Sequence, residues 1–162
     1  MNLNGVGLRR RLTHGSLDMD PAWSPDGKTI AFARYTGFGA IWLIDPDGSN
    51  ERQLTTPRGE GDIQPDWSPD GRWIAFSRAT GPFRHDIFVV RPDGTGLRQL
   101  TRHNRGNSSP VWSPDGKRIV FASTRAHRDL NDIYVMNADG KRQTRLTKGT
   151  IDNSSPDWRA KR

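Results

Sequence analysis

Four oxygen-bearing side chains recur at one position of a repeated pattern. Asp18, Asp62, Asn107 and Asn153 each lie five residues before a tryptophan. Carboxylate and amide oxygens that converge can coordinate a hard cation such as Ca²⁺ or bind a basic group of a partner. The same residue types also cap turns and hydrogen-bond to neighbouring backbone, which is the structural alternative. The spacing therefore makes these four residues a candidate site for Ca²⁺ or for a basic group of a partner.

Arginines form a second candidate set. The chain of 162 residues has 25 Lys and Arg against 18 Asp and Glu, a net charge of +7 that permits an acidic partner without requiring one. The candidate contacts to a partner, all expected on the side of the variable loops, are Arg34, Arg58, Arg84, Arg102, Arg105, Arg125 and Arg128, and Arg78 and Lys148 add to the charge of the same side. An acidic centre inside a basic rim favours a partner with a matching charge pattern, whereas a solvated arginine surface is the simpler alternative.

Common catalytic motifs do not occur in this sequence. Without cysteine there can be no thiolate metal site, disulfide or cysteine nucleophile. The four histidines form no i, i+4 pair, so no metal site is assigned to them. Neither a Gly-x-Ser-x-Gly elbow nor a phosphate-binding glycine loop is found. We therefore assign no catalytic residue and expect a protein that is not an enzyme.

The elements that must position these side chains are internal repeats. Pro-x-Trp-Ser-Pro-Asp-Gly recurs at residues 21–27, 65–71 and 110–116, and Pro-Asp-Trp begins a further copy at 156–158. Leu-Thr ends each unit, and Asp-Gly lies between the two markers. The expected repeats are approximately 14–55, 56–101 and 102–147, with a preceding outer strand at 8–13 and a following inner strand at 155–158.

Each unit has the pattern of four short strands. In Ser-Pro-Asp-Gly, proline presets φ and glycine accepts the left-handed conformation, so a tight turn should join the first two strands. Large and small residues alternate in the second strand, at 29–33, 73–77 and 118–122, which is typical of twisted sheets that pack face to face. The third strand is apolar throughout, as expected for burial on both faces.

Four-stranded antiparallel units that repeat every 40 to 50 residues describe the blades of a β-propeller. The Pro-x-Trp-Ser-Pro-Asp-Gly-Lys/Arg-x-Ile-Ala/Val-Phe segment, followed by Asp-Ile-Tyr/Phe-Val, Asp-Gly and Arg-Gln-Leu-Thr, closely resembles the TolB-type propeller repeat. The expected fold is all-β, a single propeller domain over 1–162 with about three complete blades. Because propellers have four to eight blades, we expect either a fragment of a longer propeller or a ring that is completed by a homo-oligomer.

The resemblance implies a non-catalytic scaffold that binds a protein partner through its variable loop face and channel mouth. Propellers of this family work in the bacterial periplasm within the Tol-Pal envelope system and contact the lipoprotein Pal, which predicts a periplasmic or cell-envelope location. No signal peptide or membrane-spanning segment is visible, so a cytoplasmic location stays open. One alternative is an accessory propeller of a larger peptidase, hydrolase or lyase. Nucleic-acid binding, suggested by Arg34-Tyr35, Phe38 and Phe83-Arg84, is a third and less favoured interpretation.

Overall fold

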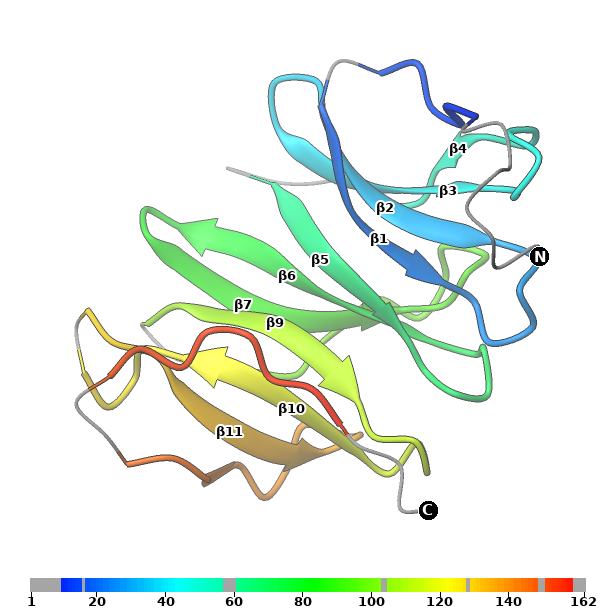
Figure 1. Ribbon diagram of the computed structural model, residues 1–162. Helices are drawn as coiled ribbons and strands as arrows, with labels where there is room; N and C mark the ends of the chain where they lie inside the picture. Colours follow the sequence, from blue (N-terminus) through cyan, green and yellow to red (C-terminus); the bar gives the residue numbers. More distant parts are fainter. Residues whose placement is uncertain are drawn as a thin grey trace.

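A computed structural model of the chain describes residues 10–15, 17–56, 61–102, 105–127, 129–148 and 151–158 (Figure 1). Its strands form three four-stranded antiparallel sheets, each with its strands in sequence order. The first sheet contains β1 (Asp18–Trp23), β2 (Ile30–Tyr35), β3 (Gly39–Ile44) and β4 (Arg52–Gln53). The second contains β5 (Asp62–Trp67), β6 (Ile74–Gly81), β7 (Arg84–Val90) and β8 (Arg98–Gln99). The third contains β9 (Asn107–Trp112), β10 (Arg118–Ser123), β11 (Asp132–Asn137) and β12 (Thr144–Arg145). The predicted all-β architecture of propeller blades is confirmed.

The Ser-Pro-Asp-Gly turn is held by its own side chains. Ser24 Oγ donates to Asp26 Oδ1 over 2.7 Å and accepts the backbone N–H of Thr29 over 2.9 Å. Gly27 has a φ of 70°, the left-handed conformation that favours glycine. The same hydrogen bonds recur in the turns at 68–73 and 113–118. These hydrogen bonds to serine hydroxyls hold the pKa of each turn aspartate below its usual range, so the aspartates of this motif have a structural role.

The Leu-Thr marker closes each blade with a side-chain clamp. Thr55 Oγ1 accepts the N–H of Ile41 over 3.0 Å, and the equivalent threonines accept N–H groups of Ile87 and Ile133 over 2.9 Å. The outer strands β4, β8 and β12 have only two residues each, so they end before Leu-Thr rather than containing it as expected. The threonine thus satisfies a backbone donor where the ladder has stopped.

Packing between sheets follows the alternation of large and small side chains. Ala31 and Ala33 of β2 form one apolar cluster with Trp67 and Phe76 of the second sheet. The second and third sheets form an equivalent cluster. Trp67 and Trp112 are buried, whereas the corresponding Trp23 is 52% exposed because no sheet within the described residues packs against that side of the first sheet. Each sheet therefore offers a large-residue face to the sheet before it.

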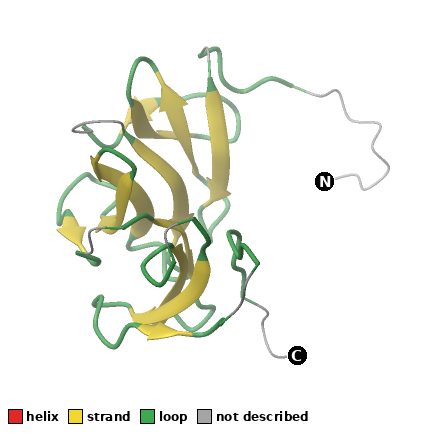
Figure 2. Ribbon diagram, turned by 90° about the vertical axis from the view of Figure 1, so that its left-hand side faces the viewer, coloured by secondary structure: helices red, strands yellow, loops and turns green. Residues whose placement is uncertain are grey.

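The three blades form an arc in which β5 contacts both β1 and β9 (Figure 1). Each inner strand has a bulge with one residue at positive φ, namely Asp20, Gln64 and Ser109. Side chains link the inner strands across the blades: Gln64 Oε1 accepts the N–H of Ser109 over 2.9 Å, and Asp66 Oδ2 accepts the N–H of Trp112 over 2.7 Å. The β2–β3, β6–β7 and β10–β11 connections lie on one side of the arc, which faces the viewer in Figure 2. The β8–β9 connection belongs to the same side, since its Arg105 lies beside Phe83 and Arg84. We call this side the loop face.

Two further segments accompany the sheets. The described part of the expected outer strand 8–13 contains no strand, although Leu12 packs on Ile30 and Phe32 of the first sheet. Residues 155–158 also form no strand, yet the indole N–H of Trp158 donates to the carbonyl oxygen of Val111 over 3.1 Å. Both segments lie against the outermost described blades. No helix in the described part of the chain is long and apolar enough to cross a membrane.

Candidate functional site

The second blade shows what the candidate oxygen ligands do. Asp62 begins β5, and its two carboxylate oxygens each lie 2.7 Å from a guanidinium nitrogen of Arg78 on β6. The ladder places these residues opposite one another, and Asp62 is fully buried. This two-point geometry orients both planar groups and neutralises both charges inside the blade.

The first blade repeats this pair with one additional carboxylate. Arg34 Nε lies 2.7 Å from Asp18 Oδ1, and Nη2 lies 3.0 Å from Oδ2. Glu51 also contacts Nη1 of the same guanidinium. The Arg34 hydrogen bond holds the pKa of Asp18 below its usual range. Asp18 is therefore charged at neutral pH, and its charge is balanced by an arginine of its own blade.

The third blade makes the equivalent contact with different residues. Asn107 stands in the place of the aspartate, and Ser123 stands opposite it in the place of the arginine. Ser123 Oγ donates to Asn107 Oδ1 over 2.8 Å. Arg125, two residues further along, reaches the same oxygen with Nη2 over 2.8 Å. The third blade thus also has a guanidinium partner, but a residue that is not paired with Asn107 in the strand ladder supplies it.

All three guanidinium groups lie over a pair of aromatic rings that face one another across the second and third strands of the blade. Arg78 lies 5.3 Å from the ring centroid of Phe76 and 5.2 Å from that of Phe88. Arg34 lies over Phe32 and Trp42, and Arg125 lies over Phe121 and Tyr134. The arginine is held by a carboxylate or amide on one side and by π faces on the other. Arg34, Arg78 and Arg125 are therefore parts of the blade interior more than of a loop surface.

The four oxygen-bearing residues, which the repeat register predicts at the mouth of the central channel, all have hydrogen-bond partners within the blades. Asp18, Asp62 and Asn107 occupy equivalent positions in their blades, but their oxygens contact arginines of the same blade. Asn153 continues the register, since its amide donates to the carbonyl oxygen of Asn131 as that of Asn107 does to His85. Among the described residues no group of three His, Asp or Glu side chains is placed to hold a metal ion. The contacts to arginine differ from the turn capping of the structural alternative, and a cation or partner site at these residues stays a prediction.

Asp86 provides a connection that the sequence analysis did not identify. Its Oδ1 accepts hydrogen bonds from Thr101 Oγ1 over 2.7 Å and from Asn107 Nδ2 over 3.1 Å. Because Asn107 belongs to the next blade, Asp86 joins the clamp of one blade to the inner strand of the following one. The first unit has Ala40 at this position, so it cannot make the connection. The sequence indicates this difference, because the second and third units have Asp86 and Asp132 directly before the isoleucine of the third strand.

Asp66 is the one described carboxylate with a strongly raised pKa. Burial raises the pKa of Asp66 to about 6, and the negative charge of Asp157 adds to the increase. The N–H groups of Trp112 and Trp67 oppose the shift. Both aspartates stand immediately before a repeat tryptophan, and Asp157 belongs to the segment that follows the third blade. The pair brings two negative charges together on the inner side of the arc.

The remaining candidate arginines have different environments. Arg102 and Arg105 are exposed in the connection between the second and third blades. Arg84 is half-buried at the start of β7. Its guanidinium lies against Gly81, so closely that a β-carbon at residue 81 would be 2.9 Å from Nη2. Arg58 and Arg128 lie outside the described residues. The loop face therefore retains a basic character at Arg84, Arg102 and Arg105.

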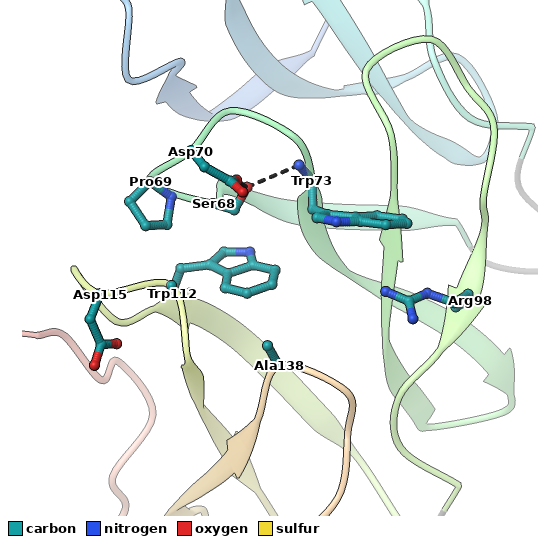
Figure 3. Close-up of a pocket in the computed structure, with 9 residues that line it drawn as sticks. Ser68, Pro69, Asp70, Trp73, Arg98, Trp112, Asp115 and Ala138 are labelled. Carbon is teal, nitrogen blue, oxygen red and sulfur yellow. Dashed lines mark hydrogen bonds between the residues drawn. The ribbon is translucent and has the colours of Figure 1, made fainter.

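A hollow on the opposite side of the arc lies between the second and third blades (Figure 3). Trp112 and Trp73 face into it from the two blades, and the guanidinium of Arg98 lies 4.4 Å from the Trp73 ring. Its two aspartates, Asp70 and Asp115, accept hydrogen bonds within their own turns. Apart from the exposed Arg98 of β8, the named lining residues belong to turns or to the packing between blades, and the two carboxylates are already engaged in their turns.

Comparison with known proteins places these features in a family. Residues 62–161 match the family described as the TolB beta propeller domain. The Tol-Pal system protein TolB of Zymomonas mobilis is 43% identical over 60 residues, which are 35% of this chain and 13% of that protein. A solved protein assigned as TolB from Agrobacterium tumefaciens has a TM-score of 0.76 and 30% identity, covering 91% of this chain and 56% of the other. An oligogalacturonate lyase in complex with manganese has a TM-score of 0.62 and 27% identity, covering 82% of this chain and 36% of the other. The chain thus spans little more than half of the Agrobacterium structure, and its match to the Zymomonas protein spans a much smaller share.

Proposed function

Because this chain belongs to the TolB β-propeller domain family, we propose that it is a non-catalytic scaffold that binds a protein partner through its loop face. One observation carries the proposal: charged residues in the blade interior are paired within the blades, whereas Arg102 and Arg105 on the loop face are exposed. Paired charges stabilise the scaffold, and exposed charges on loops are available for recognition.

The partner that the family supports best is a component of a Tol-Pal system, and a Pal-like lipoprotein is the first candidate. The curated relatives are Tol-Pal system proteins, which also supports a periplasmic site of action. The basic residues of the loop face favour a partner that has carboxylates on its surface. Homo-oligomers that complete the ring are a further proposal, supported by the 52% exposure of Trp23 at a position that is buried in the other two blades.

The test uses the soluble domain of the Pal lipoprotein from the genome that encodes this chain. We expect binding that weakens with salt and falls by at least about tenfold in the double variant Arg102→Glu, Arg105→Glu. Arg72→Glu is the matched control, because the Arg72 side chain is 80% exposed and belongs to the Ser-Pro-Asp-Gly turn of the opposite side. Equal losses in both variants would argue against the loop face, and no binding by the wild-type chain would exclude Pal as the partner.

A second candidate function is the propeller of a lyase that binds manganese, which the lyase structure in complex with manganese, at 27% identity, favours. Such a role needs oxygen or nitrogen ligands that are free to coordinate a cation. In this chain the oxygens of Asp18 and Asp62 are already paired with arginines, so the interaction scaffold is the better supported proposal.

A further inference from the structure

The turn between β6 and β7 presents Phe83 in an unusual way. The Phe83 side chain is 94% exposed, and its φ is 56°, in the left-handed region. This region is sterically strained for a residue with a β-carbon, and glycine or asparagine fills such turn positions more readily. A phenylalanine here gains nothing from burial and adds strain. Neither packing nor turn geometry within the described structure accounts for this residue.

The corresponding turn of the first blade also presents an aromatic side chain, but by a different backbone. Phe38 is 61% exposed, and the left-handed residue before it is Gly37, with a φ of 111°. Glycine relieves the strain in that turn, whereas Phe83 itself bears the strain in the other. An exposed aromatic ring is thus present at two neighbouring hairpin tips of the loop face.

A groove lies beside Phe83 and separates it from the third blade. Its lining residues are Pro82, Phe83, Arg84, Arg105, Gly106, Thr124 and Asp129. Two hydrogen bonds fix its floor, from Thr124 N to Gly106 O over 3.0 Å and from Gly106 N to Thr124 Oγ1 over 3.1 Å. The rigid floor holds a basic pair, Arg84 and Arg105, next to the exposed ring.

We propose that Phe83 is the aromatic anchor of the loop face and inserts into an apolar pocket of an acidic protein, whose carboxylates face Arg84 and Arg105. The inference rests on the proposed function and names the residue that carries most of the binding. Aromatic side chains in a fully desolvated contact are typical hot spots, and arginines beside them fit carboxylates in two-point geometry.

Two other polyanionic partners fit the groove less well. Asp129 lines the same groove and repels closely spaced phosphates, whereas a protein can place an amide or hydroxyl group opposite it. Single-stranded nucleic acid is bound by rings on which successive bases stack, and this groove has one ring. The mixture of two arginines, one aspartate and one phenylalanine therefore favours a protein surface.

The experiment measures binding of the full chain to a random copolymer of glutamate and tyrosine, with polyglutamate as the charge-only probe. We expect tighter binding to the copolymer, and we expect Phe83→Asn to weaken that binding at least about tenfold. Because asparagine tolerates the left-handed conformation, the same variant should keep or raise the melting temperature. Leu97→Ala is the control, since Leu97 is an exposed apolar residue in the β7–β8 connection, away from the groove.

Three results with these probes would overturn the proposal. One is that Phe83→Asn binds the copolymer as the wild type does, and another is that it unfolds at a clearly lower temperature, which would indicate a structural role. The third is tighter binding to vesicles of phosphatidylcholine and phosphatidylglycerol, or to oligo(dT), than to the copolymer. If the wild-type chain binds Pal and Phe83→Asn binds it equally well, this inference fails while the proposed function stands.

Discussion

The guanidinium of Arg125 lies 2.8 Å from Oδ1 of Asn107, so the third blade rebuilds a contact that its strand register no longer provides. In the first two blades the arginine follows its aspartate by 16 residues, and in the third it follows the asparagine by 18. Its ring contacts with Phe121 and Tyr134 are nevertheless the same in kind. The position of the guanidinium is retained although the residue that supplies it has moved.

Asp62 should be among the most sensitive residues of the scaffold. Asp62→Ala leaves Arg78 charged and unpaired in a buried position, which should lower the free energy of unfolding by about 3–5 kcal/mol. Asp18→Ala is the matched control, because Arg34 keeps Glu51 as a partner, and we expect a smaller loss. Urea denaturation of both variants measures the difference, and equal losses would contradict this account of the buried pair.

Asp66 should make the fold less stable as the pH rises. Its pKa is about 6 in the folded chain, above the value near 4 of an unfolded aspartate, so the folded state binds more protons between these pH values. The stabilising effect of the bound proton is complete below pH 4 and is lost as the pH passes 6. Asp66→Asn should therefore raise the free energy of unfolding at pH 7.5 by up to about 3 kcal/mol and have little effect at pH 4. Thermal unfolding across this range is the measurement, and a destabilised variant at pH 7.5 would contradict the prediction.

The threonine clamps should differ in strength between blades. Thr101→Val removes the acceptor for the Ile87 N–H and the donor to Asp86, so we expect a loss of about 1–3 kcal/mol. Thr55→Val should cost less, because Ala40 stands where Asp86 stands and only the bond to Ile41 N–H is lost. Chemical denaturation of the two variants tests the order. The reverse order would show that Asp86 does not contribute through the clamp.

Divalent cations should not stabilise the chain. A ligand at 100 times its Kd adds about 2.7 kcal/mol to the free energy of unfolding, which is easily detected as a higher melting temperature. Because arginines already pair with Asp18 and Asp62, millimolar Ca²⁺ or Mn²⁺ should leave the melting temperature unchanged. A clear increase with Mn²⁺ would instead support the lyase-like alternative.

The sequence predicts the blades well because their determinants are local. Ser24 and Asp26 stabilise their turn within a span of six residues. The alternation of large and small side chains along β2 determines which of them pack against the next sheet. It also places Asp18, Asp62 and Asn107 at one register. Their role depends on partners in another strand. In two blades the sequence does indicate these partners, because an arginine follows the aspartate after 16 residues. Arg125 breaks that spacing, and the exposure of Phe83 depends on a turn conformation that the pattern of residues does not determine.

The links between inner strands also bear on how such a chain can evolve. Gln64 and Asp66 each accept a backbone N–H of the next blade, and Asn153 donates to the third blade as Asn107 donates to the second. The second unit therefore carries the side chains that join it to the third, and the third accepts an equivalent bond from the segment that follows it. A duplication of one whole unit brings its own interfaces with it, whereas an insertion of a single residue in an inner strand moves the tryptophan and its partners out of alignment. Growth of the chain by complete units is accordingly the change that this architecture tolerates best.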